Sequence, residues 1–174
     1  MSISLYDITV GTYRQVLGAT AGFLEKGKQH CEQQGISLDD LVDYQLAKDM
    51  LPFRFQVLSV VHHSIDVLDS LEAGVFGPPS GPMDQSYTQL QRMVEDSLAA
   101  LDKWTPEQVN PFEGKDMAFQ MNDIKIPFTA EAFVLSFSHP NLFFHAATAY
   151  DVLRLKGAPL GKIDFLGQMR VKQQ

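Results

Sequence analysis

The chain has 174 residues, 45% hydrophobic and 20% charged, which is typical of a globular protein that buries a core of its own. The net charge is −7 and the basic residues are scattered, so nucleic acid is not an expected partner. Cys31 is the sole cysteine, so no intramolecular disulfide can form. No apolar run reaches the ~18 residues of a membrane span, and no signal peptide is evident. We therefore expect one cytoplasmic domain over residues 1–174.

The first third of the chain predicts two long helices and one short one. Apolar residues recur at helical spacing from residue 4 to residue 34, and Gly35 supplies a stop. Ser37 is a plausible N-cap for a short helix in "SLDDLVDYQL". A second long helix covers residues 52–72 and closes at Ala73-Gly74.

A loop and a third long helix follow. Residues 76–83, "FGPPSGPM", hold three prolines and two glycines, which predicts a loop without regular structure. The third helix begins near Asp84 and continues to Leu101, because its apolar residues alternate by three and four positions.

Residues 117–128, "MAFQMNDIKIPF", change to a period of two around Asn122-Asp123, which predicts a β-hairpin between the third and fourth long helices. The alternative is an irregular loop. Thr129 then caps a fourth helix that runs to Lys156, and Pro140 is expected to kink it. Four amphipathic helices together predict an all-α fold, a four-helix bundle with this hairpin inserted.

Two polar residues fall on the apolar side of the second long helix. At about 100° per residue, His62 lies beside Leu58 and Ile65, and Asp69 is nearly in line with it. The neighbouring His63 falls on the opposite side, together with Gln56, Ser59, Asp66 and Ser70, and is expected to face solvent. Since a buried imidazole and carboxylate need partners, His62 and Asp69 are candidate site residues.

The fourth long helix carries a matching polar stripe. Ser138, Asn141 and Thr148 share the face of His145. His139 lies about 120° away in a regular helix, so it is not expected to pair with His145. Bundles build their sites from inward polar groups on facing helices, which makes His62 and His145 candidate metal ligands and Asp69, Ser138, Asn141 and Thr148 candidate pocket-lining residues.

Two interpretations of these residues remain open. In the first, His62 and His145 bind a divalent ion, helped by Asp69 or Asn141. In the second, the same side chains form a metal-free hydrogen-bonded network beside a ligand pocket. Four phenylalanines on the fourth long helix are packing residues, pocket walls or a dimer face: Phe133, Phe137, Phe143 and Phe144.

Three segments carry a resemblance to a known family. "PNLFFHAATAYDVLRLKGAPLGKIDFLG" (140–167), "ISLYDITVGTY" (3–13) and "KDMLPFRFQV" (48–57) are similar to an uncharacterised family in the DinB/YfiT-like superfamily of small helical proteins. The resemblance implies a four-helix bundle, often a homodimer, with a pocket at one end. It also implies a zinc or nickel ion held by one histidine of helix two and two of helix four, as in thiol-dependent transferases, isomerases and hydrolases.

Transferred by position, the resemblance assigns His62 to the helix-two ligand and His145 to the second histidine of a His-x-x-x-His motif. Its first histidine is replaced by Asn141, and an amide is a poor ligand for zinc or nickel. We therefore expect a degraded site with a weak or absent metal, and a ligand-binding or interaction role with an unknown small molecule. The alternative is a divalent-metal-dependent enzyme, a thiol-dependent transferase or a hydrolase.

Overall fold

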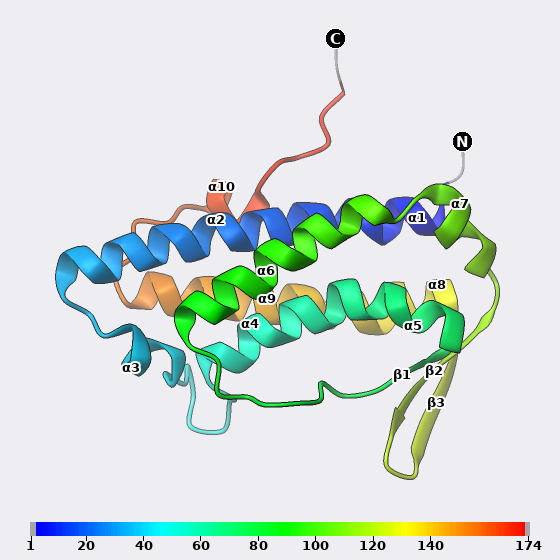
Figure 1. Ribbon diagram of the computed structural model, residues 1–174, viewed down its shortest axis with the longest axis horizontal. Coiled ribbons are helices and arrows are strands. Elements are labelled where there is room, and N and C mark those ends of the chain that lie inside the picture. Colours follow the sequence, from blue (N-terminus) through cyan, green and yellow to red (C-terminus); the bar gives the residue numbers. More distant parts are fainter. Residues whose placement is uncertain (1–2, 173–174) are drawn as a thin grey trace.

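The computed structural model describes residues 3–172, and the fold is mostly helical with a small three-stranded mixed sheet at one end (Figure 1). Its α-helices, in chain order, are α1 (Leu5–Ile8), α2 (Val10–Gln34), α3 (Leu38–Val42), α4 (Phe53–Val61), α5 (Val67–Ala73), α6 (Tyr87–Ala100), α7 (Pro106–Val109), α8 (Ala130–Phe133), α9 (His139–Leu155) and α10 (Lys162–Leu166). Two further turns are π-helical, η1 (His62–Asp66) and η4 (Val134–Ser138). Two others are 3₁₀-helical, η2 (Leu101–Lys103) and η3 (Asn110–Phe112).

The predicted ends of the long helices are confirmed at the residues whose backbone or side chain sets them. Gly35 and Gly74 end α2 and α5 in the left-handed conformation, with φ of 67° and 66°. Thr129 caps α8 by accepting the Ala132 amide. The third helix begins at Tyr87, three residues later than predicted, because Ser86 and Gln89 form a capping box.

The strands are β1 (Val75–Phe76), β2 (Asp116–Met121) and β3 (Ile124–Thr129). β2 and β3 are antiparallel around Asn122, whose φ is 52°, and β1 pairs with β2 in parallel. The prediction of a loop from residue 76 is therefore wrong at its first residue. Phe76 is 1% exposed, and burial of its ring holds the strand in place.

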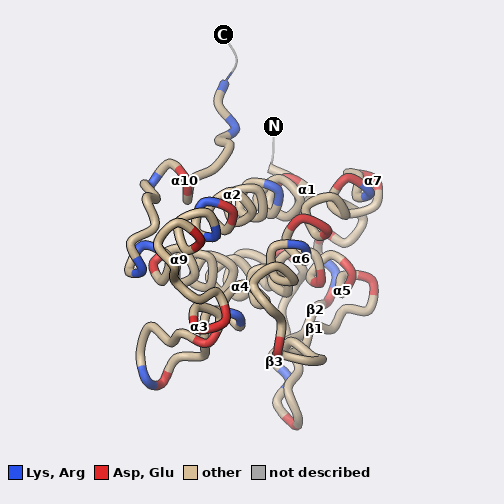
Figure 2. Tube along the Cα trace, turned by 60° about the vertical axis from the view of Figure 1, so that its left-hand side comes forward, with Lys and Arg blue, Asp and Glu red and all other residues tan. Residues whose placement is uncertain are grey.

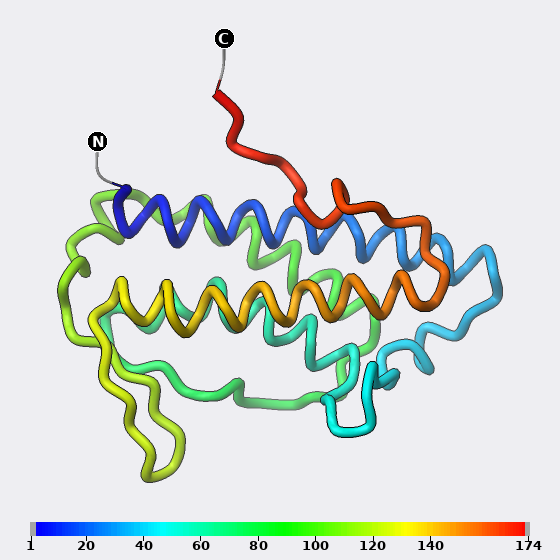
Figure 3. Tube along the Cα trace, turned by 180° about the vertical axis from the view of Figure 1, so that it is seen from behind, coloured from blue at the N-terminus to red at the C-terminus, as the bar shows by residue number. Residues whose placement is uncertain are grey.

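The long helical segments α2, α4–η1–α5, α6 and η4–α9 lie side by side, with α9 next to α2 when viewed from behind (Figure 3). Their shared core includes large side chains that are almost fully enclosed: Tyr13, Phe23, Phe53, Tyr87 and Phe133. α4 contacts both α6 and α9, so it has two buried faces rather than one. This is why Gln56 and Ser59, placed on the solvent side by helical periodicity, are 2% and 1% exposed.

Charges are distributed over many elements, as Figure 2 shows for the acidic and basic positions. Within residues 3–172, no helix combines the length and the apolar character that crossing a membrane requires. The C-terminal segment, residues 158–171, returns across α2, where Gln15 Nε2 donates to the Leu166 carbonyl at 2.8 Å and Lys26 pairs with Asp164 at 2.6 Å.

Candidate functional site

Three histidines from two helical segments form a cluster in the interior. The ring centroids of His62 and His63 are 5.3 Å apart, and those of His63 and His145 are 5.9 Å apart with nearly parallel planes. His62 and His63 belong to η1, and His145 belongs to α9. The sequence predicted a meeting of His62 and His145, and His63 lies between them.

His62 is hydrogen-bonded through both ring nitrogens. Its Nδ1 lies 2.8 Å from Asp66 Oδ2, and its Nε2 lies 2.9 Å from the carbonyl oxygen of Gly77. A carboxylate and a carbonyl both accept, so a proton on each nitrogen satisfies both partners at once. The half-exposed Asp66 carboxylate thus holds one edge of the buried ring, and the Gly77 carbonyl holds the other.

His145 is oriented by Gln56. The Gln56 amide donates to the Leu51 carbonyl at 2.7 Å, which turns its Oε1 toward His145 Nδ1 at 2.8 Å. Nδ1 therefore carries the proton, and Nε2 keeps a lone pair in the neutral ring. Burial, together with the charge of His62, lowers the pKa of His145 to about 4, so the ring is neutral at physiological pH.

His63 is the most deeply perturbed member of the cluster. It is 7% exposed, and burial followed by the charges of His62 and His145 lowers its pKa to about 3. Its Nδ1 is enclosed and has no hydrogen-bond partner among the described residues. The surrounding wall is aromatic: Phe76 stacks on His62 at 4.3 Å between centroids, and Phe137 lies 6.0 Å from His63.

His63 is buried because it follows Gln56 and Ser59 on the second buried face of this helical segment, and the π turn η1 changes the direction of the residues that come after it. A π turn accommodates one extra residue, which rotates everything after it relative to a regular α-helix. The prediction that His63 faces solvent is therefore wrong. The facing segment also contains a π turn, η4, and Ser138 Oγ at its end donates to the His63 carbonyl at 3.0 Å, so the two turns are joined.

The same rotation moves Asp69 away from the cluster. Asp69 is exposed, and Asp66 takes the place beside His62 that the sequence suggested for Asp69. Asn141 and Thr148 bond within their own helix, to the Phe137 carbonyl at 2.7 Å and the Phe144 carbonyl at 2.8 Å. Their side-chain donors are thus directed at the backbone rather than at His145.

His139 is separate from this cluster. Its ring meets Tyr13 edge-on with centroids 5.8 Å apart, and burial lowers its pKa. It occupies another side of α9 from His145. The sequence argument that His139 and His145 do not pair agrees with this arrangement.

The donors of the cluster do not fit a divalent metal ion. Metal-bound imidazole coordinates through a nitrogen lone pair, and both nitrogens of His62 face acceptors instead. His145 keeps a lone pair at Nε2 while its Nδ1 donates to Gln56, so it is at most one ligand of such an ion. Asn141 directs its amide at its own helix. Across residues 3–172, no group of three His, Cys, Asp or Glu side chains is placed to hold a metal.

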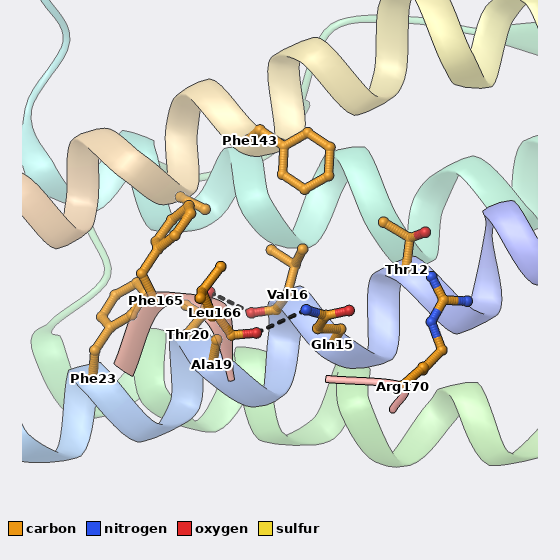
Figure 4. Close-up of a pocket in the computed structure, with 11 residues that line it drawn as sticks. Thr12, Gln15, Val16, Ala19, Thr20, Phe23, Phe143, Phe165, Leu166 and Arg170 are labelled. Atoms are coloured by element: carbon orange, nitrogen blue, oxygen red, sulfur yellow. Dashed lines mark hydrogen bonds between the residues drawn. The ribbon is translucent and has the colours of Figure 1, made fainter. Parts of the chain in front are cut away.

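Two cavities accompany these helices. One of about 130 Å³ adjoins His62 and Asp66 beneath the proline-rich loop, where Pro79, Pro82 and Met83 cover it. Another of about 210 Å³ lies between α2, α9 and the C-terminal segment, on a different face of α9 from His145 (Figure 4). Asp69, Ser138, Asn141 and Thr148 line neither of them.

Three functional positions were missed from the sequence: Gln56, Asp66 and Gly77. Gln56 and Asp66 were placed on the solvent side because the periodicity was read as that of a regular helix with one buried face. An i, i+4 histidine–aspartate pair at His62 and Asp66 was the available signal. The Gly77 carbonyl carries no sequence signal, since any residue provides one.

Comparisons with known proteins address the family and the fold. A crystal structure of a DinB family member protein from Shewanella denitrificans superposes with a TM-score of 0.80 at 23% identity, covering 98% of this chain and 96% of that one. This likeness shows a DinB-like fold. Curated protein sequences give no match. The profile of the domain of unknown function DUF1993 matches residues 5–166, and the chain therefore belongs to the DUF1993 family.

Proposed function

We propose that this protein is a metal-free, DinB-like four-helix bundle that binds a small molecule in the cavity between α2 and α9. The observation that carries the proposal is the separation of two sites. In the histidine cluster His62 is hydrogen-bonded at both ring nitrogens, whereas the cavity of about 210 Å³ is walled mainly by apolar side chains on another face of α9. Apolar cavities of this kind take small ligands without help from a metal.

The role of the histidine cluster in this proposal is structural. His62 ties η1 to the Gly77 carbonyl, and Ser138 ties η4 to the His63 carbonyl, so the network holds two helical segments and a loop in register. Buried hydrogen bonds between segments favour one packing arrangement. The cluster thereby positions α9, which forms one wall of the cavity.

The alternative function is a divalent-metal-dependent enzyme, a thiol-dependent transferase or a hydrolase. It requires His62 to release either Asp66 or Gly77 and to lose a proton, and it requires a third donor at bonding distance of about 2.0–2.2 Å. Asn141 is the nearest equivalent of the third histidine in the resemblance, and an amide binds zinc or nickel poorly.

Metal content and chelation separate these two functions. Untagged protein purified without chelator is measured by plasma mass spectrometry before and after soaking with zinc and nickel, and its melting temperature is measured with and without EDTA. We expect far less than one metal per chain and no effect of EDTA. Near one equivalent, lost in both His62→Ala and His145→Ala, would establish the enzyme as the leading function.

Ligand binding is tested with a neutral aromatic probe, benzyl alcohol, followed by chemical-shift changes in ¹H–¹³C spectra. Ala146 lines the cavity and its neighbour Ala147 does not, so Ala146→Leu should abolish saturable shifts and the control Ala147→Leu should keep them. Benzyl alcohol shifts that are absent, or equal in the two variants, would contradict binding in this cavity.

We further propose a homodimer through the outer face of α9, defined by Pro140, Phe143 and Phe144. Phe143 and Phe144 are 42% and 55% exposed, and no Lys, Arg, Asp or Glu occurs between residues 132 and 150. An aromatic, uncharged surface of this kind is favoured at the centre of protein interfaces.

The buried, unpaired Cys31 also fits a reducing, cytoplasmic location.

A further inference from the structure

We propose that the cavity between α2 and α9 is selective for a small aromatic carboxylate, with the ring in the apolar part and the carboxylate on Arg170. The inference rests on the proposed function, since it names the ligand class of the same cavity. Its three supports are the size of the cavity, the composition of its walls and the single cation at one end.

The size selects one ring with a short arm. An apolar cavity of about 150 Å³ holds one benzene molecule. The cavity here, at about 210 Å³, leaves room beyond a ring for roughly three or four further heavy atoms. It is smaller than the ~300 Å³ at which pockets for drug-sized ligands begin. Phenylacetate has the matching size.

The walls favour an aromatic body. Apolar side chains from α2, α9 and the C-terminal segment surround the space: Val16, Ala19, Phe23, Phe143, Phe165 and Leu166. The three phenylalanines come from three different elements, so they offer faces and edges to a ring from several directions. Such contacts exclude water from one end of the ligand and supply most of its binding free energy.

The polar end carries a positive charge. Thr12 and Arg170 lie at the end opposite Phe23 and Phe165 (Figure 4). Arg170 donates from Nη1 to the Asp7 carbonyl at 3.1 Å, and the guanidinium has other N–H groups available for a carboxylate. The Asp7 carboxylate accepts from the amide and hydroxyl of Ser4 at 3.1 and 2.8 Å, and these bonds, with a smaller contribution from the Arg170 charge, lower the pKa of that carboxyl.

Gly11 allows the guanidinium to reach this position. A Cβ added at residue 11 would come within 2.5 Å of Arg170 Nη1, so any larger residue displaces the charged group. The C-terminal segment that carries Arg170 is held on α2 by two other contacts, the Gln15–Leu166 hydrogen bond and the Lys26–Asp164 ion pair. The cation therefore occupies a defined place at the cavity mouth in a protein whose net charge is −7.

The test compares three probes that share a benzyl group by NMR titration of the full chain: phenylacetate, its neutral isostere phenylacetamide and the cationic phenethylamine. We expect phenylacetate to bind roughly tenfold more tightly than phenylacetamide, which is the size of one charge-assisted hydrogen bond. Phenethylamine should bind more weakly than both, because its ammonium meets the guanidinium.

Variants then assign the effect to Arg170. Arg170→Gln should remove the tenfold preference for phenylacetate while phenylacetamide binding stays unchanged. Gly11→Ala should weaken phenylacetate similarly without loss of fold, because alanine favours a helix more than glycine does. Arg14→Gln is the matched control: Arg14 lies outside the cavity and pairs with Asp102, so phenylacetate binding should persist.

The results distinguish the specificity for a carboxylate from the binding of small molecules in general. Equal binding of phenylacetate and phenylacetamide, or a preference that survives in Arg170→Gln, overturns the carboxylate specificity and leaves small-molecule binding intact. If no aromatic probe, benzyl alcohol included, shifts the resonances of Phe143 and Ala146, then both the ligand class and the proposed binding function fail.

Discussion

At the scale of single residues, His62 bonds one of two nearby carboxylates. Asp66 lies 2.8 Å from its Nδ1, whereas Asp69, three residues on, is exposed. Asp66→Asn should lower the free energy of unfolding by about 1–2 kcal/mol, because it replaces the charged acceptor of a buried imidazole. Asp69→Asn is the control and should stay within about 0.5 kcal/mol. Urea denaturation that finds equal losses would contradict the assignment of the partner.

His63 predicts a loss of stability in acid. Its pKa is about 3 in the folded protein against an ordinary value of 6.5, so between these values the unfolded chain holds a proton that the folded protein excludes. The free energy of unfolding therefore falls as the pH falls from 6.5 toward 3, by up to about 1.4 kcal/mol per pH unit for this histidine.

The variant His63→Leu tests this assignment. It removes an enclosed Nδ1 that has no partner, so stability at pH 7 should be kept or raised. Between pH 4 and 6.5, the slope of the unfolding free energy against pH should decrease by up to about 1.4 kcal/mol per pH unit, which corresponds to one proton. A slope identical to that of the unmodified protein in denaturant titrations at several pH values would show that His63 does not titrate as described.

At the scale of elements, the residues at which helices end were predictable, but the side of the helix that each inner residue faces was not. Gly35, Gly74 and Thr129 end or begin helices through local geometry, which the sequence contains. The π turns η1 and η4 depend instead on packing: the His63 carbonyl finds its partner in Ser138, 75 positions along the chain. Periodicity computed for a regular helix consequently buried Asp69 and exposed His63.

Pro140 shows the same limit. The sequence predicted a kink there, and the structure has the π turn η4 immediately before it, ending at Ser138. Proline lacks an N–H and its ring crowds the carbonyl four residues earlier, and a widened turn relieves that contact. The cause was therefore predictable, but the form of the accommodation depends on the facing helix.

Gly167 governs the attachment of the C-terminal segment. Its φ of 60° and ψ of −147° suit only glycine, and an added Cβ would lie 2.9 Å from that of Ala19. Gly167→Ala should destabilise by about 1–3 kcal/mol and speed amide hydrogen exchange in α10. Gly161→Ala is the matched control, since its nearest neighbour would be 3.9 Å away. Unchanged exchange in Gly167→Ala would show that the segment is not held by this contact.

At the scale of the whole molecule, α9 lines the cavity and also has an outer face, and Phe143 lies on the border between the two. If its outer face forms a homodimer, Phe144→Glu should convert the protein to a monomer in light scattering coupled to size exclusion, because a charge would be buried against an aromatic surface. Leu46→Glu, at a position 40% exposed between α3 and α4, should leave the mass unchanged. A monomer before mutation would refute the interface.

β1 and the residue after it cover the buried histidines, because Phe76 packs on His62 and His63 and the Gly77 carbonyl accepts from His62. This strand of two residues pairs with β2 across a separation of 43 positions, from Val75 to Ala118, so its docking closes a long chain loop for few hydrogen bonds. Opening of this strand would lift Phe76 from His62 and free the Gly77 carbonyl, so the rate at which a histidine reagent modifies His62 should measure how often the strand opens.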